Sequence, residues 1–177
     1  NLGALERLRG NPDAAVGHLR LALAIEKETL GIDHPETAQT LQNLADALLA
    51  SGQTAEADAD LRQALIVREH AFGPDHPRVA ETLVVLGALH AARGEQDLAA
   101  SAFERAAAIW ERTPPVSPLP KADALANLAV VRQSQGQTAR AMELYDRAVP
   151  IYEAELGASD ASTLRALSNQ AAAHAAA

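Results

Sequence analysis

The sequence contains no cysteine. Without cysteine there is no disulfide framework, no thiol nucleophile and no thiolate metal site. The chain also lacks the run of ~18 or more uncharged apolar residues that a membrane helix requires. Its first residues do not have the basic and then apolar layout of a signal peptide. We therefore expect a soluble protein without a membrane partner, and the missing cysteines suit a reducing, cytoplasmic environment.

Aromatic residues and lysine are also scarce. Phe, Trp and Tyr make up 3% of the 177 residues, and only Lys27 and Lys121 are lysines. Ala, Leu, Glu, Arg and Gln dominate instead, and these residues favour helix over sheet. The formal net charge is −8, and no dense cluster of Lys and Arg would attract a phosphate backbone. Nucleic acid is therefore not expected as a partner.

Catalytic motifs are missing as well. The chain has no Gly-rich phosphate loop after a strand, no His-Glu-x-x-His pair and no motif around a Ser-His-Asp set. Its many carboxylates fit exposed helix faces, where they would pair with arginine at i+3 or i+4. We therefore expect no enzymatic activity, no cofactor and no metal.

What the sequence does contain is a repeat of 42 residues. Gly10, Gly52, Gly94 and Gly136 are separated by this step, and each lies between two amphipathic stretches. Four further columns keep the same step: Ala15, Ala57, Ala99 and Ala141; Leu19, Leu61, Phe103 and Tyr145; Ala22, Ala64, Ala106 and Ala148; and Ile25, Val67, Ile109 and Ile151. Stacked helix pairs must repeat their contacts, so small residues recur where backbones approach and large residues recur where they interlock.

Local signals divide each repeat into two antiparallel helices. Residues 41–48 carry the i, i+3, i+4, i+7 spacing of one helix face. Gly52 is suited to end a helix and Thr54 to cap the next one. A proline near the first helical position follows each Gly-x-Asp-His connection. We expect helices at residues 1–9, 12–29, 35–51, 54–71, 77–93, 96–112, 120–135, 138–155 and 160–176, and no strand.

The motifs within these units resemble the kinesin light chain type of tetratricopeptide repeat. Leu30-Gly-Ile-Asp-His-Pro-Glu-Thr is followed by Thr40-Leu-Gln-Asn-Leu-Ala, and a second copy has Phe72-Gly-Pro-Asp-His-Pro with Thr82-Leu-Val-Val-Leu-Gly. Asn127-Leu-Ala and Leu156-Gly continue the pattern, so the resemblance covers the whole chain. It implies an all-α fold, a right-handed α-solenoid of antiparallel helix pairs whose first helices line a concave groove.

The repeat also predicts the domain organisation. We expect a single array over residues 1–177, with complete units at 31–72, 73–114 and 115–156 and partial units at 1–30 and 157–177. Asn1 falls in the column of Asn43, inside a first helix. This register predicts that the sequence is a fragment of a longer protein.

The resemblance further implies a binding site for an extended peptide in the groove. In kinesin light chains, as the resemblance implies, the asparagine of the Asn-Leu-Ala motif faces the groove. The matching positions in this sequence are Asn1, Asn43, Asn127 and Asn169, and the third unit has Val85 instead. The groove-facing positions that the family geometry implies are Gln39, Gln42, Asn43, Asp46 and Leu49; Glu81, Val84, Val85, Ala88 and Ala92; Asp123, Ala126, Asn127, Val130 and Gln133; and Arg165, Ser168 and Asn169. Amides can hydrogen-bond a peptide backbone, and valines can hold an apolar side chain.

Two functional hypotheses follow. In the first, the chain is a non-catalytic scaffold that binds a protein or peptide in its groove. In the second, it is an architectural or oligomerising arm of a larger multidomain signalling protein, without a groove ligand but with possible self-association. The predicted groove positions would then form an ordinary solvated face.

Four histidine and arginine positions have a structural interpretation in the repeat. His34 and His76 recur in register at a turn, so we interpret them as residues that shape the connection and not as metal ligands. His90 and Arg132 occupy a column that usually holds a large residue. They are expected to pack with their polar tips at the surface.

Three further features are structural predictions. Trp110 and Tyr152 share a column with Glu26 and Arg68 and are expected to stack between neighbouring helix pairs. Pro150 lies inside an expected helix, which it should bend or break at a cost of ~3 kcal/mol. Residues 112–118 match Arg-x-x-Pro-x-x-Pro, a pattern that polyproline-binding domains read, but a loop between packed helices favours a stiff connector.

Overall fold

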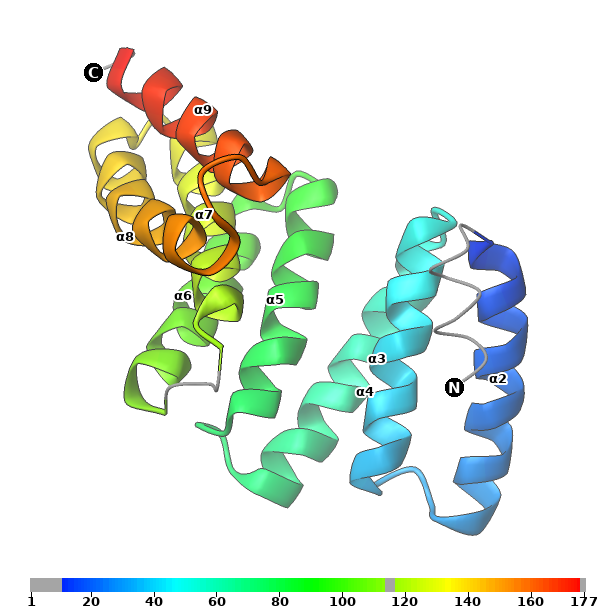
Figure 1. The fold of residues 1–177 in the computed structure, drawn as a ribbon. Coiled ribbons are helices and arrows are strands. Elements are labelled where there is room, and N and C mark those ends of the chain that lie inside the picture. Colours follow the sequence, from blue (N-terminus) through cyan, green and yellow to red (C-terminus); the bar gives the residue numbers. More distant parts are fainter. Residues whose placement is uncertain (1–10, 114–116, 176–177) are drawn as a thin grey trace. The chain divides into compact units, whose positions relative to one another are not determined.

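The regular elements of the protein are α-helices in the computed structural model, which describes residues 11–113 and 117–175 (Figure 1). They are α2 (Pro12–Thr29), α3 (Pro35–Ala50), α4 (Thr54–Phe72), α5 (Pro77–Ala92), α6 (Gln96–Arg112), α7 (Leu119–Ser134), α8 (Thr138–Leu156) and α9 (Ala161–Ala175). Each lies within one residue of its predicted boundaries. The all-α prediction is confirmed, and the helix expected at 1–9 lies outside the described residues.

The chain divides into two compact units, Asn1–Leu89 and His90–Ala177. In the first unit, α3 packs on both α2 and α4. In the second, α7 packs on α6 and α8, and α9 packs on α8 and more lightly on α7. The consecutive helices α2 to α4 in the first unit and α6 to α9 in the second are therefore neighbours, as expected for helical hairpins joined by short connections.

The alanine column is fully buried in both units. Ala15, Ala57, Ala99 and Ala141 are each 0% exposed. A methyl group at these positions lets neighbouring helix backbones approach closely, and a larger side chain would force them apart. The large column packs beside it, since Leu19, Leu61, Phe103 and Tyr145 are all buried. The column of Ile25 is less regular, because Ile25 itself is 62% exposed on α2, the first described helix.

The connections between helices repeat as well. Gly31, Gly73 and Gly157 have φ between 86° and 89°, which L side chains rarely adopt, so glycine is needed at this turn. The Nδ1 atoms of His34 and His76 each accept a hydrogen bond from the backbone N–H two residues further on, at 3.2 Å. This bond satisfies a donor that the start of a helix leaves unpaired. The structural interpretation of both histidines is thus confirmed.

The predicted packing of the other unusual residues is also observed. His90 is 6% exposed, and its Nδ1 lies 2.5 Å from a carboxylate oxygen of Glu95. The Arg132 guanidinium donates to Gln135 at 2.8 Å and forms an ion pair with Glu104. Trp110 and Tyr152 are both buried. Of the proline-rich connection, residues 114–116 lie outside the described part, and Ser117 Oγ accepts the N–H of Leu119 at 3.3 Å.

Pro150 does not break its helix. Helix α8 is continuous from Thr138 to Leu156 with Pro150 inside it, so of the predicted bend or break the break does not occur. The bend at Pro150 stays a prediction. Pro150 and Asp146 are both exposed. The Asp146 carbonyl, which cannot receive a backbone N–H from proline, is therefore open to water and need not stay unpaired.

No helix within residues 11–113 and 117–175 combines the length and the hydropathy of a membrane span. The longest, α4 and α8 with 19 residues each, carry charged residues along their length.

Asp60 on α4 has an unusual environment. Its Oδ2 atom is buried and has no hydrogen-bond partner in the described part of the chain. Burial raises the pKa of Asp60 to about 6, and the negative charge of Glu56 adds to the rise, while Lys27 and Arg20 oppose it. The folded chain therefore binds a proton that the unfolded chain has already lost between pH 3.8 and about 6. The contribution of Asp60 to stability falls as the pH rises through this window.

Replacing Asp60 by asparagine tests this environment. Asp60→Asn should match the wild-type free energy of unfolding near pH 4, where the carboxyl group is protonated. At pH 7.5 the variant should be more stable by about 1–2 kcal/mol, less than the full pKa shift implies because Asp60 is only half-buried. Urea denaturation at both pH values measures this difference. A stability difference that does not change with pH would contradict the assignment.

Replacing Pro150 by alanine tests the energetics of α8. Ala24 and Ala108 occupy the same column, so alanine fits this position of the repeat. Pro150→Ala should raise the free energy of unfolding by about 2 kcal/mol, since it restores a helix hydrogen bond but loosens the unfolded chain. The reverse change at the matching site, Ala108→Pro, should destabilise the protein by a similar or larger amount. Thermal unfolding of both variants decides the point, and a neutral Pro150→Ala would show that water fully replaces the lost bond.

Candidate functional site

One column of side chains links the second helix of a pair to the predicted groove face of the first. Its members are Glu26 on α2, Arg68 on α4, Trp110 on α6 and Tyr152 on α8. Glu26 accepts a hydrogen bond from the Thr40 hydroxyl on α3 at 3.0 Å. Tyr152 donates its hydroxyl to Asp123 on α7 at 2.7 Å. The residue type in this column therefore determines which side-chain contacts support the groove face of the first helix.

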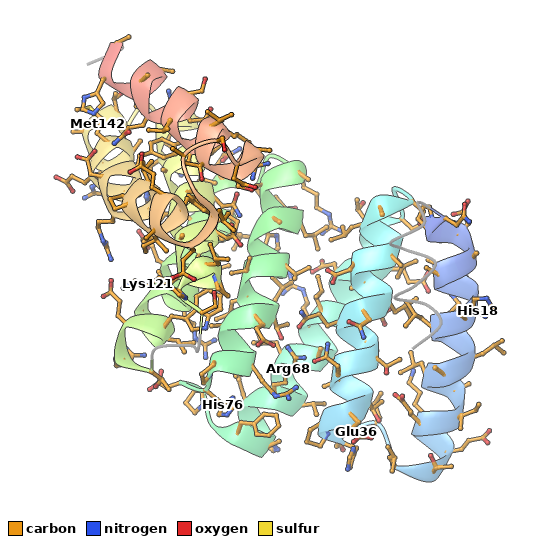
Figure 2. The ribbon with its side chains drawn as sticks, in the orientation of Figure 1. His18, Glu36, Arg68, His76, Lys121 and Met142 are labelled. Atoms are coloured by element: carbon orange, nitrogen blue, oxygen red, sulfur yellow. The ribbon has the colours of Figure 1, made fainter. Side chains whose placement is uncertain are left out.

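In the first unit the residue of this column is Arg68, which forms a hydrogen-bonded network with its neighbours, here called the Arg68 network. The Arg68 guanidinium is 0% exposed and lies between α3 and α5 (Figure 2). It donates to Gln39 Oε1 at 2.6 Å and to Thr82 Oγ1 at 2.7 Å. It also donates to the Arg78 carbonyl oxygen at 2.9 Å and to Gln42 Oε1. Four neutral acceptors thus surround one buried cation.

The charge of Arg68 is only weakly compensated. Burial lowers the pKa of Arg68, and the Glu81 carboxylate, 3.7 Å away, opposes this effect. Glu81 is half-exposed, so water screens its attraction. A buried charge held mainly by neutral groups depends on all of their hydrogen bonds. The network should therefore fix the packing of α3, α4 and α5 at this point.

Gln42 is a correction to the sequence prediction. It was expected on the groove surface, but it is 9% exposed and its side-chain oxygen accepts from both Arg68 and Thr82. The reason is that the buried Arg68 guanidinium on α4 requires a hydrogen-bond acceptor on α3. The repeat register alone does not reveal this requirement, because other units have Glu, Trp or Tyr in the same column.

Gln39 and Asn43 line a cleft over the start of α3, here called the α3 cleft. Its lining consists of Glu26, His34, Pro35, Glu36, Gln39, Thr40, Asn43, Phe72 and Arg78. Gln39 Nε2 donates to Asn43 Oδ1 at 3.2 Å, so the two amides form one hydrogen-bonding surface. The Phe72 ring, 38% exposed, stacks on His76 with centroids 4.7 Å apart. Sequence reasoning missed the aromatic wall of this cleft, because Phe72 belongs to a connection and not to the groove register.

The remaining predicted positions of the first unit do not line the α3 cleft. Asp46 is half-buried, and Glu81 and Ala88 are exposed. Val84 and Val85 are half-buried, and Val85 packs against the core that includes Leu86. Val85 therefore offers less apolar surface than the sequence prediction assumed.

In the second unit the predicted residues come together in one place, here called the α7–α9 pocket. Asp123, Asn127, Val130, Arg165 and Asn169 were all predicted, and all line it. The complete lining is Asp123, Ala126, Asn127, Val130, Tyr152, Ser162, Arg165, Ala166 and Asn169, around a volume of about 200 Å³. Tyr152, Ser162 and Ala166 complete the lining and were not among the predicted groove residues. Of these three, only Tyr152 had a signal in the sequence, because it shares a repeat column with Arg68.

The walls of the α7–α9 pocket are polar and carry both signs of charge. Asp123 holds the Tyr152 hydroxyl, and burial followed by this hydrogen bond raises the pKa of Tyr152, which stays a neutral donor. Arg165 is exposed and forms no hydrogen bond or ion pair with the described residues. The nearby Tyr145 hydroxyl is buried without a hydrogen-bond partner in the described part of the chain, and burial raises the pKa of Tyr145. The pocket can therefore offer donors and acceptors, but no reactive constellation is present in it.

Comparison with known proteins agrees with this geometry. Tetratricopeptide repeat models match residues 1–68, 43–112 and 122–162. No curated protein matches the chain by sequence. A structure of a Podosopora anserina protein assigned to the kinesin light chains, with nearly identical TPR-like repeats, superposes with a TM-score of 0.82 at 27% identity, covering 99% of this chain and 83% of that one.

Two further structures are similar. BtubC (BKLC) from P. vanneervenii has a TM-score of 0.81 and 27% identity over 88% of this chain, which spans 62% of that protein. MamA has a TM-score of 0.67 at 21% identity, covering 98% of this chain and 78% of that one, and shows likeness of fold alone.

These findings first define the class of protein: an α-solenoid built from helical hairpin repeats. More particularly, the chain belongs to the tetratricopeptide repeat family, and its repeats are similar to those of kinesin light chains. Tetratricopeptide repeats generally mediate protein–protein interactions and are typically non-catalytic. Its fold and its family are thus those of a protein-interaction scaffold.

Removing the buried cation tests the Arg68 network. Arg68→Ala should lower the free energy of unfolding by about 3–5 kcal/mol, because it leaves a cavity and removes the donor that the four acceptors share. Arg62 on the same helix provides a matched control, since its ion pair with Asp58 is at the surface. Arg62→Ala should cost less than about 1 kcal/mol. Equal losses in the two variants, measured by chemical denaturation, would show that the network is not important for stability.

Proposed function

We propose that the chain binds an extended segment of a partner protein against its first helices, with Asn43, Asn127 and Asn169 as the main hydrogen-bonding residues. One observation carries this proposal: in both compact units the hollow over the first helices is lined by the asparagine column. The similarity to kinesin light chains supports it, because the corresponding asparagine of that family faces the bound peptide.

The chemistry of these residues suits a peptide backbone. A side-chain amide can donate to a backbone carbonyl and accept from a backbone N–H at the same time. Such contacts give affinity with little dependence on the partner's sequence. Sequence preference would come from the neighbouring walls. These are Phe72 and Arg78 in the α3 cleft and the oppositely charged Asp123 and Arg165 in the α7–α9 pocket. Asp46, Glu81, Val84 and Ala88 would contribute more weakly, since they lie beside these hollows.

Selection from a random peptide library provides a probe for this function. A displayed library of linear peptides should yield binders to the immobilised chain, and a synthetic copy of one binder is then measured by fluorescence anisotropy. The double variant Asn43→Ala with Asn127→Ala should raise Kd by about 10-fold or more, because each lost amide removes about 1 kcal/mol of hydrogen bonding.

The matched control removes polar side chains from second helices. Arg62→Ala with Glu153→Ala should leave Kd unchanged, since both residues are exposed on α4 and α8. A folded asparagine double variant that binds with wild-type affinity would refute the proposal. Light scattering over a concentration series adds a second criterion: self-association together with failure to select peptides would favour an architectural arm without a groove ligand.

A further inference from the structure

The same position of the repeat is closed in one unit and open in the other. Between α3 and α5 the space is filled by Gln42, Arg68 and Thr82, which bond to one another. The repeat places Ala126, Tyr152 and Ala166 at the matching positions of the second unit. The two alanines leave room where the larger side chains stand in the first unit, and the α7–α9 pocket is the result.

The charges around this pocket are opposite and are not paired with each other. Asp123 on α7 is engaged with the Tyr152 hydroxyl through Oδ1, and the Arg165 guanidinium on α9 has no hydrogen-bond partner in the described chain. Both residues line the pocket together with the exposed Asn127. A gap therefore separates an acceptor wall from a donor wall. A ligand group that enters it meets both.

Among the side chains of a partner segment, these walls discriminate by charge. A carboxylate would pair with Arg165 but would be repelled by Asp123, and an ammonium group would suffer the reverse. An aliphatic side chain would leave the polar groups of the walls without partners. A carboxamide is neutral, accepts through its oxygen and donates through its NH2 group, so it can satisfy both walls at once.

From this arrangement we propose that the α7–α9 pocket takes the carboxamide side chain of a glutamine or asparagine from the bound segment. The inference rests on the proposed function, because the segment must lie over α7 and α9 for its side chain to enter. Asn127 at the rim would hold the backbone of that residue, and Ala126 and Ala166 form the small floor. The first unit would not select a carboxamide at the matching position, which the Arg68 network occupies.

Blocked amino acids allow the pocket to be tested without knowledge of the partner. The probes are the N-acetyl, N-methylamide derivatives of glutamine, glutamate, lysine and leucine, titrated into 15N-labelled protein. Binding is followed on the side-chain signals of Asn127 and Asn169 and on Arg165 Nε–H. The glutamine probe should bind with a Kd on the order of 10 mM, as expected for a small fragment. The other three probes should bind at least about 5-fold more weakly.

Two charge variants test the selection mechanism. Asp123→Asn should reverse the preference between glutamate and glutamine, because the repulsion of a carboxylate disappears while Arg165 remains. Arg165→Gln should improve binding of the lysine probe for the opposite reason. A preference for glutamine that neither variant changes would overturn the charge argument.

A third variant closes the pocket with residues that the chain already uses. Ala126→Gln, Tyr152→Arg and Ala166→Thr together introduce the three side chains that fill the matching space of the first unit, beside Asp123 where the first unit has Gln39 and Arg165 where it has Glu81. The variant should keep a wild-type helical circular dichroism spectrum and should lose glutamine binding. Should it misfold, Ala166→Leu fills the same floor with a single apolar side chain and carries the same expectation.

The outcomes separate this inference from the proposed function. Preferred binding of the glutamine probe at the α7–α9 signals supports the inference. Equal or tighter binding of the glutamate, lysine or leucine probe overturns it, even when library-selected peptides still require Asn43 and Asn127. In that case the proposed function stands and only the carboxamide assignment fails.

Discussion

The close approach of helices at the alanine column is the constraint on which the rest of the structure depends. Ala15, Ala57, Ala99 and Ala141 are fully buried at the crossing points of their helices. Because a buried alanine presents only a methyl group, the helices packed against it can approach closely within each unit. The 42-residue step is the sequence record of this repeated burial. It also gives the first helices α3 and α7 equivalent positions within their own units.

Against this repeated backbone packing, the residue in one column of the second helices differs from unit to unit. Arg68 binds Gln42 and Thr82 and fills the space beneath the first-helix face. Tyr152 takes a single hydrogen bond to Asp123 and leaves a pocket above it. The three residues at these repeat positions, Gln42, Arg68 and Thr82 in one unit and Ala126, Tyr152 and Ala166 in the other, thus decide whether the space is filled or open. Under the proposed function, such differences would set which ligand groups each unit accepts.

The fold could be predicted from the sequence because its signals are local and recur several times. Glycine turns, Asp-His-Pro connections and the alanine column each fix a helix boundary or a contact, so the predicted helices within the described residues differ from the structure by no more than one residue at an end. The site could be predicted less completely. The register assigned Asn127 and Asn169 to the groove, and both line one pocket, but it could not show that Gln42 is buried, because that depends on a guanidinium 26 residues away.

Other differences have the same origin in tertiary environment. Pro150 was expected to bend or break its helix, yet α8 continues through it, and Pro150 is exposed, where the loss of one backbone bond is tolerated. Phe72 and Tyr152 line the two hollows although one was assigned to a turn and the other to the core. That residues 1–177 form one array remains a prediction from the repeat.

Photo-crosslinking measures most directly where a partner lies on this chain. A benzoylphenylalanine probe would replace either Val130 on α7, which is 47% exposed beside the α7–α9 pocket, or Leu98 on α6, which is 53% exposed. With a library-selected peptide bound, the account predicts a crosslink from position 130 and none from position 98. A crosslink from position 98 alone would place the binding surface on the second helices and contradict the account.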